Sequence, residues 1–187
     1  MSRRLVVLTD RHQVRAGRSL RDVLGAAADA GLRIVLLREL DLPDDERAKI
    51  ADHARTCGME VLAAHRPVPG GAGVHLPAAA PAPEIPTRWG RSCHSRADAV
   101  AAAGDGAWWA TLSPYAETES KPGYGPPLAA DDFAALPLPV YALGGITVDN
   151  AAAARAAGAY GVAVMGAVMR ASDPADVVAA LLSAVRS

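Results

Sequence analysis

The sequence predicts an α/β protein, and most simply a compact (β/α)8 barrel of the TIM type. Short apolar runs alternate with helical patterns along nearly all of its 187 residues. Such alternation is typical of right-handed crossovers that join parallel strands. The apolar runs are almost unbroken, as expected of strands covered on both faces. Eight runs in this order favour a closed barrel, and an open doubly wound sheet is the structural alternative.

The expected strands and helices follow one another in a regular order. We expect strands at 5–10, 33–38, 60–64, 73–77, 91–95, 108–112, 140–143 and 160–165. The first helix begins after Ser19, a good N-cap, and carries apolar residues at helical spacing before it ends at Gly31. Further helices are expected at 44–57, 96–103 and 148–157, and Asp173-Pro174 opens the last one as cap and first-turn proline.

Two connections are too short or too irregular for a full helix. Residues 66–72, between the third and fourth strands, are rich in proline and glycine. Residues 78–86, after the fourth strand, are mostly alanine and proline and leave little more than a turn. We therefore expect a single barrel domain over 1–187, with the helix after strand three missing and the one after strand four reduced.

Composition excludes several classes of function. Hydrophobic residues make up 51% of the chain, charged residues 21%, and the formal net charge is −1. A chain without a basic excess is not expected to bind nucleic acid. Two cysteines cannot form a disulfide framework or a four-ligand zinc site. Charges or prolines interrupt every apolar stretch, and no signal peptide is recognisable, so we expect a cytoplasmic protein without a membrane partner.

The most informative loops follow the last two strands. Gly144 and Gly145 come after the seventh strand, and Met165 and Gly166 after the eighth. Paired glycines expose backbone N–H groups, and in barrels of this type phosphate sites recur at these two positions. We predict that these four residues bind a phosphate group, although a Gly-Gly pair can also serve only as a tight turn.

The loop after the sixth strand carries hydroxyl groups and a lysine. Ser113, Thr118, Ser120 and Lys121 lie in a long polar segment, and Lys121 is one of two lysines in an arginine-rich chain. Hydroxyls and an ammonium group suit a flap that closes over a phosphorylated substrate. We predict that these residues bind substrate; the alternative is a solvated surface loop.

The fifth strand offers candidate catalytic side chains. On a strand, Ser92 and His94 point to one face and Cys93 to the other. An imidazole at the barrel mouth can exchange protons near neutral pH. We predict that His94 and Ser92 are catalytic and that Cys93 packs against the helices; a hydrogen-bonded core histidine is the alternative reading of His94.

A few polar residues at other strand ends complete the set of candidates. Arg38 ends the second strand, where it can contact an anionic substrate. Asp10 is the one carboxylate that we place at the barrel mouth, and His65 ends the third strand. No HxxH or CxxC motif or carboxylate cluster occurs, so no metal site is predicted.

Seven short segments, taken together, resemble the thiamine phosphate synthase/TenI family of small barrels. They are Thr9-Asp10, Arg38, Gly-Val-His-Leu at 73–76, Gly-Arg-Ser-Cys-His-Ser at 90–95, Thr-Glu-Ser-Lys at 118–121, Leu-Gly-Gly-Ile at 143–146 and Gly-Val-Ala-Val-Met at 161–165. The resemblance implies a phosphorylated thiazole as ligand. The synthase branch couples it to hydroxymethylpyrimidine pyrophosphate with Mg²⁺, whereas the TenI branch includes a metal-free thiazole tautomerase.

The resemblance assigns roles to residues already singled out. The loops at Gly144-Gly145 and Met165-Gly166 match the thiazole phosphate site, and residues 118–121 match the flap that meets phosphate oxygens. Ser92 matches a serine of the pocket, and Arg38 matches the arginine of the synthase Gln-Leu-Arg-x-Lys motif.

Departures from the family pattern separate the two branches. The Gln and Lys of the synthase motif are Leu36 and Leu40, the Asn-Asp pair reads Ala64-His65, and Pro77 begins a run that lacks the second metal-side aspartate. A pyrophosphate leaving group depends on a metal to neutralise its charge. The tautomerase histidine, in turn, aligns with Pro114, so either His94 or His65 is the base, or the activity is a different one or absent.

These observations leave three hypotheses. The first is a TenI-like tautomerase that transfers a proton on a thiazole phosphate and needs no cofactor. The second is a divergent thiamine phosphate synthase that uses Mg²⁺. The third is a barrel that binds a thiazole or thiamine phosphate without catalysis. A homodimer is also possible, because outer helices such as 175–185 are apolar.

Overall fold

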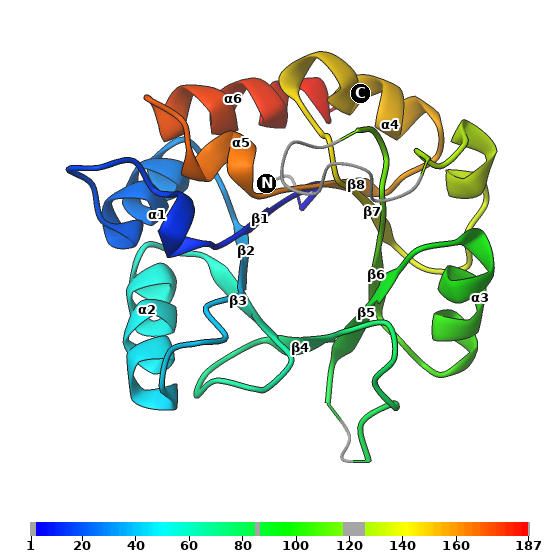
Figure 1. Cartoon of the computed structure of the whole chain (residues 1–187), viewed down its shortest axis with the longest axis horizontal. Helices are drawn as coiled ribbons and strands as arrows, with labels where there is room; N and C mark the ends of the chain where they lie inside the picture. Colours follow the sequence, from blue (N-terminus) through cyan, green and yellow to red (C-terminus); the bar gives the residue numbers. More distant parts are fainter. Residues whose placement is uncertain (1–2, 85–86, 118–125, 187) are drawn as a thin grey trace.

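The chain folds as a closed barrel of eight parallel strands with helices on its outside (Figure 1). The structure is a computed structural model, and it describes residues 3–84, 87–117 and 126–186. The strands are β1 (Leu5–Leu8), β2 (Ile34–Leu37), β3 (Glu60–Ala64), β4 (Gly73–Leu76), β5 (Trp89–Cys93), β6 (Trp109–Leu112), β7 (Val140–Leu143) and β8 (Gly161–Val164). Because β1 pairs in parallel with both β2 and β8, the sheet has no edge, and the open-sheet alternative is wrong.

The helices are distributed unevenly around the barrel. They are α1 (Leu20–Asp29), α2 (Asp44–Thr56), α3 (Arg96–Gly104), α4 (Val148–Ala156), α5 (Gly166–Met169) and α6 (Pro174–Ala184), with 3-10 turns η1 (Arg11–Gln13) and η2 (Ala130–Phe133). No helix joins β3 to β4, and the described residues between β4 and β5 form only turns, as the sequence predicts. In Figure 1 the chain on both sides of β4 runs as loops, so this side of the barrel lacks a helical cover.

Three local predictions differ from the structure. β5 begins at Trp89, two residues before the expected start, because Trp89 and Gly90 pair with β4. The loop expected after β8 is the short helix α5, in which the amides of Val168 and Met169 donate to the carbonyl of Met165. β1 ends at Leu8, two residues before the expected end, and Asp10 is instead the N-cap of η1.

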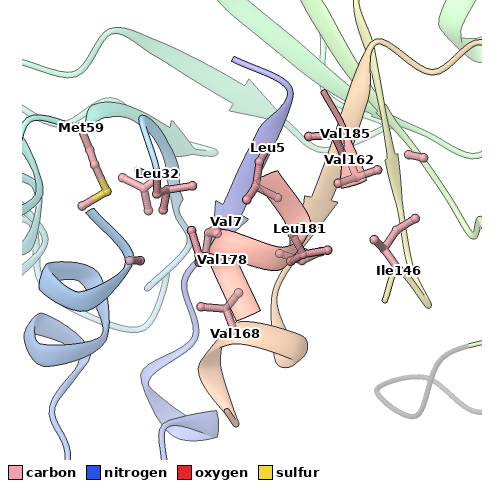
Figure 2. Packing of buried hydrophobic residues seen from close by; sticks show 14 of the residues in the cluster. Leu5, Val7, Leu32, Met59, Ile146, Val162, Val168, Val178, Leu181 and Val185 are labelled. Carbon is pink, nitrogen blue, oxygen red and sulfur yellow. The ribbon is translucent and has the colours of Figure 1, made fainter. Parts of the chain in front are cut away.

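The strands separate an inner core from an outer one. Alternate residues point into the barrel, where aliphatic side chains such as Val6, Leu8 and Leu36 meet Trp109 and Tyr141. Their neighbours along each strand point outward to the helices. Figure 2 shows this outer core, in which Leu5 and Val7 of β1 lie beside Val178 and Leu181 of α6. Both faces of the sheet are therefore covered with apolar side chains.

The predicted helix starts are confirmed. Ser19 and Asp22 form a reciprocal capping box at α1. The carboxylate of Asp173 accepts hydrogen bonds from two backbone amides at the start of α6. Val178, Leu181 and Leu182 of α6 are buried against the barrel, so the apolar residues on which the dimer prediction rests are used within the monomer. Among the described residues, no helix has the length and apolar character needed to span a membrane.

Candidate functional site

A cavity of about 480 Å³ opens at the carboxyl ends of the strands. This volume is in the range of small-molecule sites, and this end of the barrel is where such sites occur in the fold. Its lining comes from the ends of β1, β2, β5, β6, β7 and β8 and from the loops that follow them: Leu8, Arg38, His94, Ser113, Pro114, Glu117, Leu143, Gly144, Gly145, Ile146, Thr147, Ala163, Val164, Met165, Gly166, Ala167 and Arg170.

The two glycine turns line the same cavity. Gly144 and Gly145, after β7, and Met165 and Gly166, after β8, all belong to its wall. Both glycines of the first turn have positive φ angles, 90° and 65°, which residues with a side chain rarely adopt. The four residues predicted to bind phosphate are therefore neighbours in space, with their backbone at the cavity surface.

Hydrogen bonds fix the turn after β7 in place. The amides of Tyr115 and Ala116, after β6, donate to the carbonyls of Leu143 and Gly144 at 2.9 and 3.0 Å. A Cβ atom at Gly145 would overlap the backbone of Ala116, so the two loops approach too closely for any other residue. The Asn150 side chain closes the turn from the other side, because its amide donates to the carbonyl of Gly145 at 2.8 Å.

The turn after β8 presents backbone amides and an arginine. The amides of Gly166 and Ala167 occupy the first turn of α5 and have no acceptor within that helix. Arg170 follows one helical turn later, and its guanidinium group lies directly over Gly166. Gln13 holds this guanidinium group, since its side-chain oxygen accepts a hydrogen bond from Arg170. Two backbone amides and one guanidinium group are thus close together in this part of the cavity wall.

The charge of the cavity favours an anion. Arg38 enters from the end of β2, where its backbone amide donates to the hydroxyl of Thr9 at 2.9 Å and its Nη1 lies 2.7 Å from Sδ of Met165. Two arginines and a histidine line the cavity, and Glu117 is the one carboxylate among the described lining residues. The described wall therefore has more cationic than anionic side chains, which suits a phosphate ester.

His94 lies in the cavity beside the loop after β6. Its backbone amide donates to the carboxylate of Asp98 at 2.9 Å, which fixes the chain where β5 leads into α3. Its Nδ1 lies 3.3 Å from both the carbonyl oxygen and the hydroxyl of Ser113. The predicted proton carrier and one predicted substrate-binding residue are therefore in contact at the mouth of the barrel.

The structure places the other two residues of this β5 segment as the alternation predicts. Cys93 is fully buried in the outer core, and burial raises the pKa of its thiol to about 11, so it remains an unreactive packing residue. Ser92 points into the barrel, where its hydroxyl lies 3.1 Å from Nε2 of His75. Ser92 is partly exposed but is not among the residues that line the cavity.

Several predicted residues fall elsewhere. Thr118, Ser120 and Lys121 lie outside the described residues. His65 is exposed at the end of β3 and is not part of the cavity wall; partial burial and the nearby Arg38 lower its pKa. His65 is therefore not placed to act in this cavity.

Sequence reasoning missed Arg170 and Glu117. Arg170 follows an apolar segment that we expected to be a loop. A loop conformation does not predict that the Arg170 side chain lies over Gly166. The spacing of four residues from Gly166 is the one available signal, because a helix brings positions i and i+4 to the same face. Glu117 lies in the expected flap but carries no motif of its own.

Fold and site together define a class of protein, a (β/α)8 barrel with a small-molecule cavity at the carboxyl ends of its strands. Comparison with known proteins narrows this class. The sequence profile described as thiamine monophosphate synthase matches residues 72–168. A candidate thiamine-phosphate synthase of Geobacter sulfurreducens is 38% identical, over 96% of this chain and 92% of its own length. The thiamine-phosphate synthase of Roseiflexus castenholzii is 37% identical, over 90% of this chain and 82% of its own.

The chain belongs to the thiamine monophosphate synthase/TenI family. A solved structure agrees on the fold: the thiamine phosphate pyrophosphorylase of Pyrococcus furiosus aligns with a TM-score of 0.79 over 97% of this chain and 95% of its own, at 23% identity. The relatives are named as enzymes of thiamine synthesis, and the family resemblance found in the sequence is confirmed.

The synthase members of this family imply a Mg²⁺ ion, and the described residues of this chain do not gather the donors that it needs. Mg²⁺ prefers carboxylate and phosphate oxygens in an octahedral set. Within residues 3–84, 87–117 and 126–186, no three His, Cys, Asp or Glu side chains gather in a group that could hold a metal. Asp10 accepts hydrogen bonds from the backbone of His12 and the side chain of Gln13, and the buried Glu39 pairs with Arg11. These carboxylates are occupied by structural contacts.

Proposed function

We propose that the protein binds a thiazole phosphate and transfers a proton on its ring, as the tautomerases of the TenI branch do. The glycine turns after β7 and β8 hold the phosphate, and His94 is the catalytic residue that moves the proton. The observation that carries this proposal is that His94 shares one cavity with both glycine turns and with Arg170.

The phosphate end is supported by backbone groups and by charge. The amides of Gly166 and Ala167 lie at the start of α5, and the guanidinium group of Arg170 lies beside them. Charge-assisted hydrogen bonds of this kind are the strong ones in proteins. The aliphatic lining from Leu8 and Ala163, deeper in the cavity, suits the heterocyclic ring. The substrate is thus oriented with its phosphate at the turns and its ring over the inner core.

The hydrogen bonds of His94 suit a general base. The carbonyl of Ser113 can only accept, so the contact at 3.3 Å is a hydrogen bond when Nδ1 of His94 carries the proton. In the neutral ring, Nε2 then holds the lone pair that can take a proton from the substrate. The neighbouring hydroxyl of Ser113 can donate to the ligand or follow the proton.

The proposed step needs no second substrate. Nε2 of His94 removes a proton from a ring carbon, the electron pair of that C–H bond enters the ring system, and a proton returns to the far carbon of the displaced double bond. One C–H bond breaks and another forms, so the atoms and electrons of the thiazole phosphate balance. The aromatic ring is the more stable product.

The test is the aromatisation of the thiazole carboxylate phosphate tautomer, followed by ultraviolet absorbance. We expect acceleration over buffer, and we expect His94→Ala to lower the rate about 100-fold or more, the usual contribution of a general base. Cys93→Ala is the matched control, because this neighbour on β5 faces the outer core, and it should change the rate by less than about twofold. Full activity in His94→Ala would remove His94 from the mechanism.

The names of the relatives support a second candidate, a thiamine phosphate synthase. This function requires hydroxymethylpyrimidine pyrophosphate as a second substrate and a metal to neutralise the leaving group. Incubation of both halves with and without Mg²⁺ separates the two functions. Formation of thiamine phosphate that depends on Mg²⁺, without aromatisation of the tautomer, would replace the first proposal with the second.

The partner that we propose is therefore a small phosphorylated thiazole. Binding of thiazole phosphate in calorimetry with no turnover in either assay would identify a binding protein in place of an enzyme. The homodimer stays a prediction, to be measured by sedimentation.

A further inference from the structure

A buried polar network occupies the barrel interior on the side that lacks helices. His75 of β4 is 4% exposed, and it contacts three side chains from the two following strands. Its Nε2 lies 3.1 Å from the hydroxyl of Ser92 and 3.2 Å from that of Thr111. Its Nδ1 lies 3.1 Å from the indole Nε1 of Trp109, whose ring stacks beside the imidazole. None of these four side chains belongs to the cavity wall.

The indole of Trp109 determines which nitrogen of His75 carries the proton. An indole N–H can only donate, so Nδ1 of His75 must be the acceptor in this contact. The imidazole is held neutral, because burial lowers the pKa of His75 to about 3. Its one proton is therefore on Nε2, from which it is directed at the hydroxyls of Ser92 and Thr111.

Two glycines leave room for this indole beside the strands. A Cβ atom at Gly90 would overlap the five-membered part of the Trp109 ring, and one at Gly73 would lie 2.8 Å from its far edge. The two glycines, on β5 and β4, thus accommodate the indole between the strands. In this position the indole N–H donates to Nδ1 of His75 at 3.1 Å.

Ser92 is left with a hydrogen to donate. Its oxygen accepts from Nε2 of His75, and among the described residues its hydroxyl has no other hydrogen bond. Ser92 lies one pleat below His94 on the same face of β5, and it is partly exposed whereas Thr111 is buried. The cavity reaches down to inner-core residues such as Leu8 and Ala163. The O–H of Ser92 thus lacks an acceptor among the described residues, and it lies one pleat below His94, which lines the cavity.

We infer that His75 is a positioning residue that makes Ser92 a hydrogen-bond donor, so that the site selects a ligand whose ring carries an acceptor atom. Trp109 determines the tautomer of His75, and His75 in turn donates to the oxygen of Ser92. Ser92 is the residue that contacts the ligand. With the thiazole phosphate of the proposed function, on which this identification of the acceptor rests, that atom is the ring nitrogen. A ligand donor at this position would have to share the Ser92 oxygen with Nε2 of His75, and the Ser92 hydrogen would then have no acceptor on the ligand.

The proton position can be measured without any ligand. In the full-length protein with ¹⁵N-labelled histidine, NMR should show His75 with a protonated Nε2 and an unprotonated Nδ1. Trp109→Phe removes the N–H that imposes this state, so the variant should show a mixture of both tautomers. A wild-type His75 that is protonated on Nδ1, or on both nitrogens, would overturn the inference even if the Trp109 variant does not fold.

The consequence for the ligand can be measured by calorimetry with two probes. These are the thiazole phosphate and its thiophene counterpart, in which a C–H replaces the ring nitrogen. Ser92→Ala should weaken binding of the thiazole about 3- to 10-fold, as the loss of one hydrogen bond does, and should leave the thiophene within about twofold. Thr111→Val is the matched control, because Thr111 shares the same imidazole proton but is too buried to reach a ligand.

A conservative variant separates positioning from packing. His75→Gln keeps an N–H near the position of Nε2 and should retain the preference for the thiazole, whereas His75→Leu should lose it. Equal weakening of both probes by Ser92→Ala, or none, would overturn the inference and leave the proposed function standing. Failure of the wild-type protein to bind either probe would remove the proposed function, and the NMR measurement would still decide the role of His75.

Discussion

The two sides of this barrel are built in different ways. Around β7, β8, β1 and β2, helices α4, α5, α6, α1 and α2 cover the strands, and the interior is mainly aliphatic, with residues such as Val6, Leu8 and Ala163 (Figure 1). Around β4 and β5 the described connections are mostly loops, and the interior holds the polar network of His75. The glycine turns that line the cavity belong to the first side.

This difference bears on the proposed function. A phosphate needs backbone amides and positive charge, and the helix-rich side offers both at Gly166 and Arg170. A metal-bound pyrophosphate needs carboxylates, and His65 and Pro77 stand after β3 and β4, where the resemblance to the synthase branch implies an Asn-Asp pair and a second aspartate. The helix-rich side is expected to bind the ligand, and the other side to select and stabilise.

The largest effect should come from a side chain at the turn after β7. Gly145→Ala places a Cβ atom into the backbone of Ala116 and Glu117 at a φ of 65°. We expect binding of the thiazole phosphate to fall about 100-fold or more, because the turn must move away from the cavity, with a loss of about 1–3 kcal/mol of stability. Calorimetry and denaturant unfolding measure the two effects.

Gly70→Ala is the matched control on the helix-poor side. Gly70 also has a left-handed φ, 68°, but an added Cβ would meet only the guanidinium group of Arg55, which can move. It should cost about 1–2 kcal/mol of stability and leave binding unchanged. If both glycine variants bind the ligand like the wild type, the phosphate site is not at this turn.

Arg170→Ala should have the next largest effect. Loss of one guanidinium group beside the phosphate should weaken thiazole phosphate about 10- to 30-fold and reduce the salt dependence of binding. Arg170→Lys should recover part of the affinity, since it restores the charge without the planar fork. The measurement is calorimetry at two salt concentrations.

The control for this charge lies on the opposite side of the mouth. Arg66→Ala removes a guanidinium group that binds Asp44 and the carbonyls of Leu40 and Leu42, outside the cavity. We expect its affinity to match that of the wild type. A loss of affinity in Arg66→Ala equal to that in Arg170→Ala would mean that general charge, and not the place of Arg170, governs binding.

The polar network should make the free energy of unfolding depend on pH. We expect this effect to be smaller than those of the Gly145 and Arg170 variants. The pKa of His75 is about 3 in the folded protein and near 6.5 in the unfolded chain, so between these values the unfolded chain binds the extra proton. Stability therefore rises with pH across this window and is lost on acidification, by no more than about 1.4 kcal/mol per pH unit from this group. Denaturant unfolding at pH 4, 5, 6 and 7 measures the slope.

His75→Gln should flatten that slope. His65 contributes in the same direction, because its pKa is also lowered by burial and by nearby arginines, so His65→Gln is measured in parallel. We expect the larger change in His75→Gln, since His75 is the more deeply buried of the two. Equal slopes in His75→Gln and the wild type would contradict a neutral, buried His75.

Much of the architecture was open to prediction because it rests on local pattern. The strand and helix order, the missing helix between β3 and β4, and the caps at Ser19 and Asp173 all follow from spacing and residue type. The predicted barrel also implied that the two glycine turns lie close together, because adjacent parallel strands end at the same rim. The errors arose at α5 and at the start of β5, where short segments carry too few residues for a clear period.

The sequence by itself determined the barrel and the position of its mouth, since hydrophobic periodicity and turn residues act over a few neighbouring positions. Only the tertiary structure decided that Arg170 returns over Gly166 and that Trp109 of β6 assigns the proton of His75 on β4. The reason is that burial and hydrogen-bond partners depend on residues far apart in the chain. A histidine in a strand has no defined tautomer until a neighbouring strand brings it a donor.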